Sequence, residues 1–581
     1  MSGIDWIVLI ATLLGIIAYG LYKSRTSKDL DGYFLSNRSM PWYLVLLSIM
    51  GTQASAVTFL SAPGQAFTDG MRFVQYYFGL PLAMVVLCIT FVPLFSRLKV
   101  FTAYEFLEKR FDLQTRILTS FLFLLQRGLS TGISIYAPSI ILSSLLGWNI
   151  FLTNIVMGGL LIIYTVSGGA KAVAYTQQLQ FVIIFIGMFL AGYMIVHLLP
   201  PGIGFADALR VSGASGKLNV ITTGAEGGHF DWRDKYNIWS GVIGGFFLAL
   251  SYFGTDQSQV GRYLTAKNTT ESKLGLLMNG LVKVPMQFFI LLIGALLFTF
   301  YQFKPSPVFH NRAVEEKAQQ TVYKDSLKLV QAEYVTKNAK QAELSSDYIN
   351  AYHANNVGKL KELKDSVALN NKQLEALRGA YKGYIKKALP LADNNDTNYI
   401  FLRFVIDYLP VGLIGLLIAI IFLAAWGSIA AALNSLASCT MIDFHRRFSK
   451  NDAELNEGEL GKKEYRISRI YTFAWGIFCI IVAQFANRMG SLIEAVNILG
   501  SLFYGVILGI FLVAFYVKRV GGKAVFWSAI ISEIIIVALF FLNEYGVINL
   551  SFLWLNAVGA LLVVMFSLVF QLSYQPFQKS K

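Results

Sequence analysis

The stretch SIMGTQASAVTFLSAPGQAF, residues 48–67, lies where a membrane-spanning helix is expected, yet it is rich in polar side chains. Its hydrogen-bonding groups and helix breakers are Gly51, Thr52, Gln53, Ser55, Thr58, Ser61, Pro63, Gly64 and Gln65. Lipid offers no hydrogen-bond partners, so such groups are tolerated in a span only when they are buried in protein or line a cavity. A helix that unwinds at mid-membrane also frees backbone carbonyl groups that can bind a cation. The stretch therefore predicts a broken helix at a binding site, with a tight helix–helix contact between small residues as the alternative.

The composition is that of a polytopic membrane protein. The chain has 581 residues, of which 55% are hydrophobic, and its mean hydropathy is +0.54. The formal net charge is +15, but the Lys and Arg residues gather in short loops between apolar runs, as topology signals do, so we expect no nucleic-acid partner. All three cysteines lie in apolar runs, which argues against a disulfide framework. The run from Ile4 to Tyr22 lacks a basic start and a small-residue cleavage site, so it predicts a retained helix.

The predicted fold class is an all-α membrane protein with about thirteen transmembrane helices. Apolar runs long enough to cross the lipid bilayer lie at roughly 4–22, 41–66, 73–96, 115–145, 147–167, 174–198, 236–257, 275–302, 401–438, 467–487, 490–517, 524–542 and 550–571. Because the number is odd, the two termini are expected on opposite sides of the membrane.

Basic residues in three loops indicate the orientation. Loops 23–39, 97–114 and 440–466 fall on one side of the predicted topology, which we assign to the cytoplasm. Their basic residues are Lys23, Arg25, Lys28, Arg38, Arg97, Lys99, Lys109, Arg110, Arg446, Arg447, Lys450, Lys462 and Lys463. The N-terminus is then outside and the C-terminus cytoplasmic. A plasma membrane, in bacteria the inner membrane, is the expected location.

Two segments are too polar to span. Residues 199–235 are Gly-rich and predict an external loop. Residues 303–400 contain Lys-, Ala-, Leu- and Glu-rich runs with apolar residues at helical spacing, which predicts two or three amphipathic helices in an external hairpin. This insertion separates a membrane part at 1–302 from a second at 401–581. We interpret it as a structural appendage, with a lid or a docking module for an extracytoplasmic partner as alternatives.

A second polar span supports the binding-site interpretation. LAAWGSIAAALNSLASCT, residues 423–440, again places small and hydroxyl residues in an apolar helix. Two such helices in corresponding places of the two halves indicate an inverted-repeat transporter. Carbonyl oxygens of the broken helix and a hydroxyl such as that of Ser428 are hard, neutral ligands, which suit Na⁺ better than a transition metal.

Arg127 is also exceptional. The run LTSFLFLLQRGLSTGISIYAPSIIL places it more than two turns inside an apolar helix. An arginine in the membrane is costly and is usually paired or functional, and its planar fork suits a carboxylate. The alternative is a structural ion pair, for instance with Glu494.

The motifs around these residues resemble the sodium/solute symporter family over residues 1–302 and 401–571. The matching stretches are STGISIYAPSIIL (130–142), YTVSGGAKAVAYTQQLQ (164–180), SYFGTDQSQVGRYLTAK (251–267), LNSLASCTMID (433–443) and VKRVGGKAVFW (517–527). SAVTFLSAP and TGISIYAP look most like the branch with sodium/iodide, monocarboxylate and multivitamin transporters. The resemblance implies the LeuT-type fold, with five plus five helices in inverted repeat and extra helices at the ends.

The resemblance also implies a sodium site. The positions matching its ligands are Ile49, Thr52, Ala424, Gly427 and Ser428, although Gly427 lacks the usual hydroxyl. Relatives with an additional sodium site carry an aspartate where this chain has Gln177, and hydroxyl residues where it has Ala430 and Ala431. We therefore expect one coupling-cation site.

For the substrate, the resemblance points to a cavity between the same helices. The matching positions are Ala56, Thr58, Gln75, Tyr252, Lys283 and Asn497, and sialic acid carriers of the family bind the substrate carboxylate with an arginine at or near Arg127. Gln75 could instead be capped by its own helix, and Lys283 could extend its ammonium group to the membrane interface.

Together these features predict a secondary transporter that couples Na⁺ to a small organic, carboxylate-bearing solute by alternating access. A symporter of a sugar or another neutral solute, a transporter-like sensor and a channel are the alternatives. We expect no enzyme and no catalytic residues, because the sequence shows no nucleotide-binding loop, no Cys/His metal cluster and no assembled nucleophile–base pair. The sequence leaves open the substrate and the choice between Na⁺ and H⁺.

Overall fold

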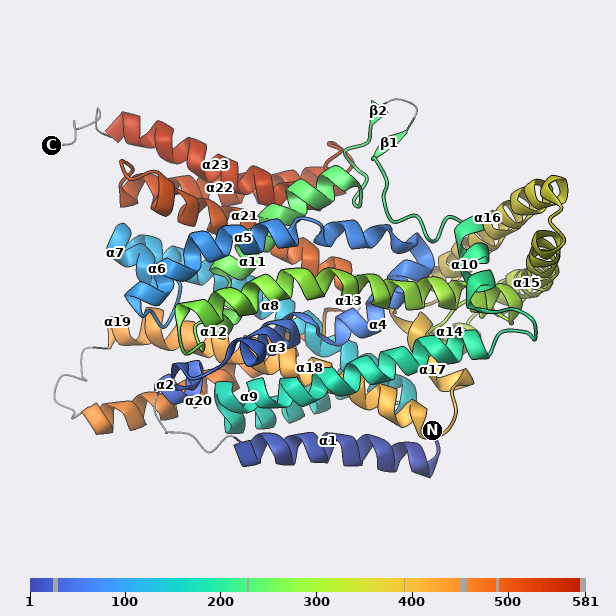
Figure 1. Ribbon diagram of the computed structural model, residues 1–581, viewed down its shortest axis with the longest axis horizontal. Helices are drawn as coiled ribbons and strands as arrows, with labels where there is room; N and C mark the ends of the chain where they lie inside the picture. Colours follow the sequence, from blue (N-terminus) through green and yellow to red (C-terminus); the bar gives the residue numbers. More distant parts are fainter. Residues whose placement is uncertain (24–29, 227–228, 391, 450–456, 487–490, 575–581) are drawn as a thin grey trace.

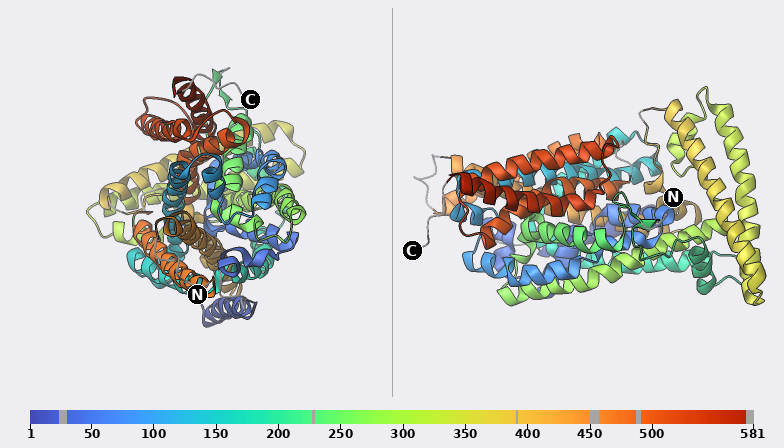
Figure 2. Two further views of the ribbon diagram at one scale, coloured as in Figure 1. Left: turned by 90° about the vertical axis from the view of Figure 1, so that its left-hand side faces the viewer. Right: turned by 90° about the horizontal axis from the view of Figure 1, so that it is seen from above.

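The protein is a bundle of long helices that run along one axis, with a helical hairpin set across one end (Figures 1 and 2). The computed structural model describes residues 1–23, 30–226, 229–390, 392–449, 457–486 and 491–574. The end that carries the hairpin is called the hairpin end here, and the opposite end the far end. Within the described residues, ten helices are long and apolar enough to cross a membrane, or up to eleven when a bent pair is counted as one span.

Most spans are single helices. They are α1 (Gly3–Lys23), α8 (Leu113–Leu146), α13 (Thr269–Phe303), α20 (Glu457–Ala483), α21 (Leu492–Tyr516), α22 (Gly522–Glu544) and α23 (Phe552–Tyr574). Met71–Leu98 forms a span from η2 (Met71–Tyr77), α5 (Leu80–Ile89) and α6 (Phe91–Leu98). Another is built from η3 (Ser240–Gly244) and α11 (Gly245–Thr255) and is followed by α12 (Gln257–Tyr263).

The polar stretch at 48–67 is a broken helix, as predicted. Its halves are α3 (Trp42–Gln53) and α4 (Ala56–Asp69), which meet at an angle of 61°. The backbone of Ser55 is extended at the break, and the amide of Ala54 closes α3 by donating to the Met50 carbonyl oxygen at 2.7 Å. The Gln53 carbonyl oxygen accepts from the Ser55 amide at 3.1 Å, and the break leaves the carbonyl groups of Gly51 and Thr52 without an amide four residues on in the same helix.

The spans predicted at 147–167 and 174–198 lie within one element, α9 (Ile150–His197). The hydroxyl groups of Tyr164 and Thr176 are only 2.8 Å apart. Twelve residues of straight helix rise about 18 Å, so α9 is not straight between these positions. Its apolar segment Val173–His197 is long enough to cross a membrane, and Ile150–Val166 is a shorter apolar segment, whose separate crossing stays a prediction.

The span predicted at 401–438 is wrong in one respect, because it is divided. Helix α17 (Ile400–Tyr408) ends before Pro410, and α18 (Leu413–Cys439) begins after Gly412, whose φ of +92° favours glycine. The carboxylate of Asp5 in α1 caps the start of α18, accepting from the amides of Gly412 at 2.6 Å and Gly415 at 3.3 Å. The sequence reading missed this break because the apolar run continues across it.

The insertion folds as a hairpin of α15 (Lys324–His353) and α16 (Val357–Ala388), preceded by α14 (Arg312–Ala318). It has a small core of its own, which includes Leu327, Tyr334, Leu374, Tyr381 and Ile385. At its tip, Nε2 of His353 lies 3.1 Å from Asp207 in α10 (Phe205–Ala214). The hairpin thus has its own core, and it contacts the bundle at its tip as well as through the two segments that connect it to the membrane helices.

The remaining elements are short. They are α2 (Leu30–Leu35), η1 (Ser36–Arg38), α7 (Glu105–Arg110), β1 (Ala225–Glu226), β2 (His229–Phe230), η4 (Thr397–Tyr399), η5 (Thr440–His445) and α19 (Arg446–Phe448). Segments α2, α7 and α19 of the three basic loops all lie at the far end, and the N-terminus lies at the hairpin end (Figure 1). Arg25, Lys28 and Lys450 fall outside the described residues.

Candidate functional site

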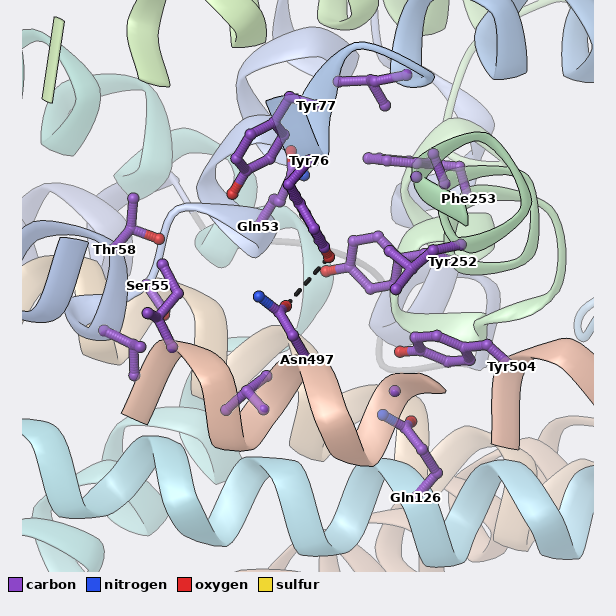
Figure 3. A pocket seen from close by; sticks show the side chains of 18 of the residues that line it. Gln53, Ser55, Thr58, Tyr76, Tyr77, Gln126, Tyr252, Phe253, Asn497 and Tyr504 are labelled. Carbon is purple, nitrogen blue, oxygen red and sulfur yellow. Dashed lines mark hydrogen bonds between the residues drawn. The ribbon is translucent and has the colours of Figure 1, made fainter. Parts of the chain in front are cut away.

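A central cavity opens beside the break between α3 and α4 (Figure 3). Its walls come from the break, η2, α8, α11 and α21. The lining residues are Gln53, Ser55, Val57, Thr58, Tyr76, Tyr77, Leu80, Gln126, Arg127, Gly245, Leu248, Ala249, Tyr252, Phe253, Ile493, Val496, Asn497, Gly500 and Tyr504. The Tyr76 hydroxyl donates to the Asn497 side chain at 3.1 Å, which joins η2 to α21 across the cavity (Figure 3). A cavity with apolar walls and a few polar groups suits a small organic solute.

Arg127 borders this cavity and is 8% exposed. Its Nη1 lies 3.7 Å from the carboxylate of Asp256, and its Nε has no hydrogen-bond partner. Asp256 is itself held by the Tyr504 hydroxyl and the Ser258 amide, both at 2.7 Å. The charge of the guanidinium group is thus compensated by Asp256 without a close hydrogen bond, and its Nε–H remains free to donate.

The alternative pairing of Arg127 with Glu494 is wrong. Glu494 instead accepts from Nζ of Lys235 and from the Tyr236 hydroxyl, both at 3.0 Å. It lies near the start of α21, whereas the Asp256 that pairs with Arg127 stands between α11 and α12. Periodicity within one helix could not show which of the two acids faces Arg127.

The structure brings four of the predicted substrate residues together. Thr58, Arg127, Tyr252 and Asn497 all line the cavity. Ala56 is fully buried at the start of α4 and does not line it.

Gln75 and Lys283 also lie outside the cavity. The Gln75 amide donates to the Tyr236 carbonyl oxygen and the Thr222 hydroxyl, both at 3.0 Å, and its oxygen accepts from the Thr222 amide at 3.1 Å. Lys283 is fully buried, and its Nζ lies 5.6 Å from the ring centre of Tyr77 with no hydrogen-bond partner. Gln75 therefore holds a loop in place, while Lys283 lies behind a residue of the cavity wall.

Sequence reasoning missed part of the lining. The additional polar or aromatic residues are Gln53, Ser55, Tyr76, Tyr77, Gln126, Phe253 and Tyr504. Gln53 and Ser55 lie inside the polar stretch that predicted the break, so the signal for them was present. Tyr504 gives no such signal, since an aromatic residue in an apolar helix reads equally well as a core residue.

The residues of the predicted sodium site lie on α3 and α18, on either side of the Gln177 side chain. Nε2 of Gln177 donates to the Gly427 carbonyl oxygen at 3.1 Å and lies 3.5 Å from the Thr52 hydroxyl. Its oxygen accepts from the Ser48 hydroxyl at 3.0 Å. The amide thus connects the broken helix to α18.

Two glycines make room for this amide. A Cβ on Gly51 would lie 2.8 Å from Cγ of Gln177, and one on Gly427 would lie 2.7 Å from Oε1 of Gln180. A serine at Gly427 would require the end of the Gln180 side chain to move, and its Cβ would lie 3.3 Å from Cγ of Gln177. Ala430 and Ala431 are fully buried beside Val173 and Tyr164.

The donor set around Gln177 fits a weakly bound alkali cation. The Ser428 hydroxyl donates to the Ala424 carbonyl oxygen at 3.0 Å, so its own lone pairs remain available. The last turn of α3 supplies the carbonyl groups of Gly51 and Thr52 without helical partners, whereas the Ile49 carbonyl group lies one turn earlier, within the helix. All of these are neutral oxygens. The described residues contain no group of three or more His, Cys, Asp or Glu that could hold a metal ion.

A larger opening of about 710 Å³ lies next to the cavity on the hairpin side. Its lining includes Asp69, Arg72, Lys235, Tyr236 and Glu494. Glu494 stands about one turn before Asn497 of the central cavity and is bonded to Tyr236 and Lys235, which line the same opening.

Comparison with known proteins agrees with this geometry. The sequence profile of the sodium:solute symporter family matches residues 33–325 and 380–532. This chain belongs to the sodium:solute symporter family. The profile leaves out most of α15 and α16, so the symporter carries a hairpin that the family pattern does not include.

Relatives of this symporter cover most of its length. The sodium/sialic acid symporters NanT of Aliivibrio fischeri and SiaT of Proteus mirabilis are each 25% identical, cover 97% of this chain, and are themselves covered over 91% and 93%. The human sodium/iodide cotransporter is 30% identical over 276 residues, which is 47% of this chain and 41% of that protein.

One solved structure has the same fold. It is a substrate-bound, outward-open state of a Na⁺-coupled sialic acid symporter, 23% identical, with a TM-score of 0.74 and full coverage of both chains. The predicted family and fold class are thereby confirmed.

Proposed function

We propose that this symporter couples Na⁺ to the uptake of a small organic solute that carries a carboxylate. The observation that carries this proposal is the Arg127 guanidinium, buried in the wall of a cavity that also borders the break in the α3–α4 helix. A planar fork is suited to a carboxylate, and Nε is still free to donate. Two relatives that match 97% of the chain are sialic acid symporters, and sialic acid is a carboxylated sugar.

The rest of the cavity would hold the body of the solute. Thr58 and Asn497 offer hydrogen bonds, and Tyr76 and Tyr252 offer aromatic faces. The ring centre of Tyr252 lies 5.9 Å from the Arg127 guanidinium carbon. A solute whose carboxylate binds the arginine would therefore lie against this ring.

Sodium would bind at the end of α3 opposite α18. Ile49, Thr52, Ala424 and Ser428 would supply its oxygen ligands, while the Gly427 carbonyl group is already engaged by Gln177. Because Gln177 carries no charge and occupies the space between these helices, we propose a single coupling cation. Its binding would stabilise the contact between the broken helix and α18.

The mechanism is alternating access. Sodium and solute bind from the side of the hairpin end, the Glu494 and Tyr236 contacts close above them, and release follows on the far side. One unit charge that crosses 100 mV contributes about 2.3 kcal/mol to uptake. The three basic loops support a cytoplasmic far end, and the N-terminus and the insertion at 303–400 would then be extracytoplasmic. The membrane is then a plasma membrane, such as a bacterial inner membrane.

One observation favours a neutral solute instead. Asp256 already compensates the charge of Arg127, so the cavity could accept a sugar through hydrogen bonds alone. The insertion could in addition dock an extracytoplasmic partner, which a pull-down with the hairpin shortened would test.

Uptake into proteoliposomes distinguishes the two solute classes. We expect accumulation of a labelled carboxylate such as N-acetylneuraminate or pyruvate, lost when choline replaces Na⁺ at constant pH. The amide or methyl ester of the same solute should not compete. Accumulation in choline, or equal competition by the uncharged derivative, would contradict the proposal.

A further inference from the structure

A second cavity lies at the junction of the hairpin and the bundle, away from the central site. It measures about 340 Å³ and is bounded by the end of α4, the end of α13 and the hairpin helices α15 and α16. Its volume is within the range of small-molecule sites. Because the family profile omits residues 326–379, this cavity is built in part from residues that the family pattern does not include.

Aromatic rings form one side of this hairpin cavity. Phe67 packs edge-to-face against Phe298 and Tyr301, with ring centres 5.6 and 6.0 Å apart. Tyr334 of α15 lines the cavity from the hairpin. The hydroxyl group of Tyr301 is buried and has no hydrogen-bond partner. These walls suit a ligand with an apolar body.

Cationic groups gather on the other side. Arg378 and Lys382 line the cavity and both contact a single carboxylate, that of Asp396, at 3.0 and 2.5 Å. Lys217 donates to the Thr68 carbonyl oxygen, and its Nζ lies 4.9 Å from the ring centre of Phe298. Two cations therefore share one acid, and a third cation lies at the aromatic wall.

The nearby acids compensate these cations incompletely. Glu375 lies 3.9 Å from Lys217, but its side chain is 68% exposed, so solvent screens the pair. The carboxylate of Asp69 accepts a hydrogen bond from the Gln65 amide, and the same amide lies 3.5 Å from the Glu494 carboxylate. Burial lowers the pKa of Lys217, and the carboxylates of Glu375 and Asp69 oppose this shift without outweighing it.

We propose that the hairpin cavity binds a small organic carboxylate with an apolar body. The carboxylate would lie between Lys217 and Arg378, and the apolar body against Phe67 and Phe298. Charge-assisted hydrogen bonds to two cations and stacking on rings explain why both features occur in one cavity. This site does not depend on which solute the central cavity carries.

The position of the site gives it access to the transport cycle. Thr68 and Asp69 at the end of α4 belong to its lining, and α4 begins at the break that borders the central cavity. A ligand in the hairpin cavity would therefore contact the outer end of the helix whose inner end faces the solute.

The test is calorimetric titration of the full chain in lipid nanodiscs with benzoate, using the Arg127→Lys variant to weaken any binding in the central cavity. Gly379 lines the hairpin cavity, and a Cβ there meets nothing within 4 Å, so Gly379→Phe adds a ring at the cavity wall from a position with open space. Gly383 on the same helix also has open space and lines no described cavity, so Gly383→Phe is the matched control.

We expect benzoate to bind the Arg127→Lys protein and its Gly383→Phe derivative alike, and the Gly379→Phe derivative at least tenfold more weakly. Lys217→Met should weaken binding as well. The neutral isostere benzamide and inorganic phosphate should bind at least tenfold more weakly than benzoate. Absence of benzoate binding, equal binding in the two glycine variants, or equal binding of benzamide or phosphate would overturn the proposal.

Discussion

Gln177 is the residue that most distinguishes the cation region of this symporter. Its amide takes up hydrogen bonds from Ser48 and gives one to the Gly427 carbonyl group, with Thr52 close by. The neutral amide thereby connects oxygen atoms of two helices, as a bound cation could also do. The amide presents partially positive hydrogen atoms to these oxygens, and a cation presents a full positive charge. Unlike a bound cation, this side chain is covalently attached to its helix.

Replacing Gln177 by glutamate should create a second cation site. A carboxylate in this position faces oxygen atoms of two helices, Ser48 and Thr52 on α3 and Gly427 on α18, so its burial there favours a bound cation. We expect the sodium dependence of uptake to become cooperative, with a Hill coefficient clearly above unity. The wild-type protein and Gln178→Glu should give a hyperbolic dependence. Cooperative sodium dependence in the wild type would contradict a single coupling site.

The guanidinium group of Arg127 should be needed for its shape as well as its charge. Arg127→Lys keeps a positive charge near Asp256 but cannot present two parallel donors. We expect the protein to fold with a nearly unchanged melting temperature, and the uptake of the carboxylate solute to fall more than about tenfold, from the loss of about 1.5–3 kcal/mol of hydrogen bonding to charge. Normal uptake by this variant would exclude Arg127 as the carboxylate ligand.

At the scale of elements, the root of the hairpin packs directly on α4. A Cβ on Gly64 would lie 2.0 Å from the carbonyl oxygen of Thr397 in η4. Gly64→Ala should therefore push these elements apart and lower the free energy of unfolding by about 1–3 kcal/mol, the usual cost of overpacking. Thermal unfolding in detergent measures this, and Gly15→Ala on α1, where a Cβ meets nothing within 4 Å, is the control.

The connection between α16 and η4 should make stability depend on pH. Burial raises the pKa of Asp393 to about 7, with Asp396 adding repulsion and Lys382 opposing it. Between about pH 4 and 7 the folded state then holds a proton that the unfolded chain has released, so stability falls as the pH rises through this window. We expect a lower melting temperature at pH 8 than at pH 5, and Asp393→Asn should remove most of the difference. An identical pH profile in the variant would show that another group is responsible.

How far the sequence predicts these elements depends on whether the signal is local. The break at 54–55 was predictable, because polar groups and small residues cluster within one stretch. The hairpin was predictable from helical spacing of apolar residues. The division at 409–412 and the pairing of Arg127 with Asp256 were not, because the first lies inside a continuous apolar run and the second joins residues more than a hundred positions apart.

At the scale of the whole molecule, the hairpin is separable from the transport path. The family profile passes from residue 325 to 380 without it, and Figure 2 shows it lying across the end of the bundle. Its two helices are already joined before the tip is reached, because the Asn370 amide donates to the Gln341 side-chain oxygen at 2.7 Å.

Shortening the hairpin should leave transport intact. Replacing residues 344–367 by a short Gly/Ser turn removes the tip and its contact with Asp207 but keeps the paired bases of α15 and α16. We expect sodium-dependent uptake within about twofold of the wild type, since loop length alone has a small energetic effect. Loss of uptake in a variant that still folds, shown by an unchanged elution volume and melting temperature, would make the hairpin part of the transport machinery.

The cap that Asp5 places on α18 makes the first helix more than a peripheral anchor. The helix that carries Ser428, α18, begins with amides of Gly412 and Gly415 that donate to the carboxylate of Asp5 in α1. Cleavage after the first few residues would therefore leave those amides exposed at the start of a core helix. A symporter truncated there could keep its cavity and Arg127 and still bind sodium more weakly.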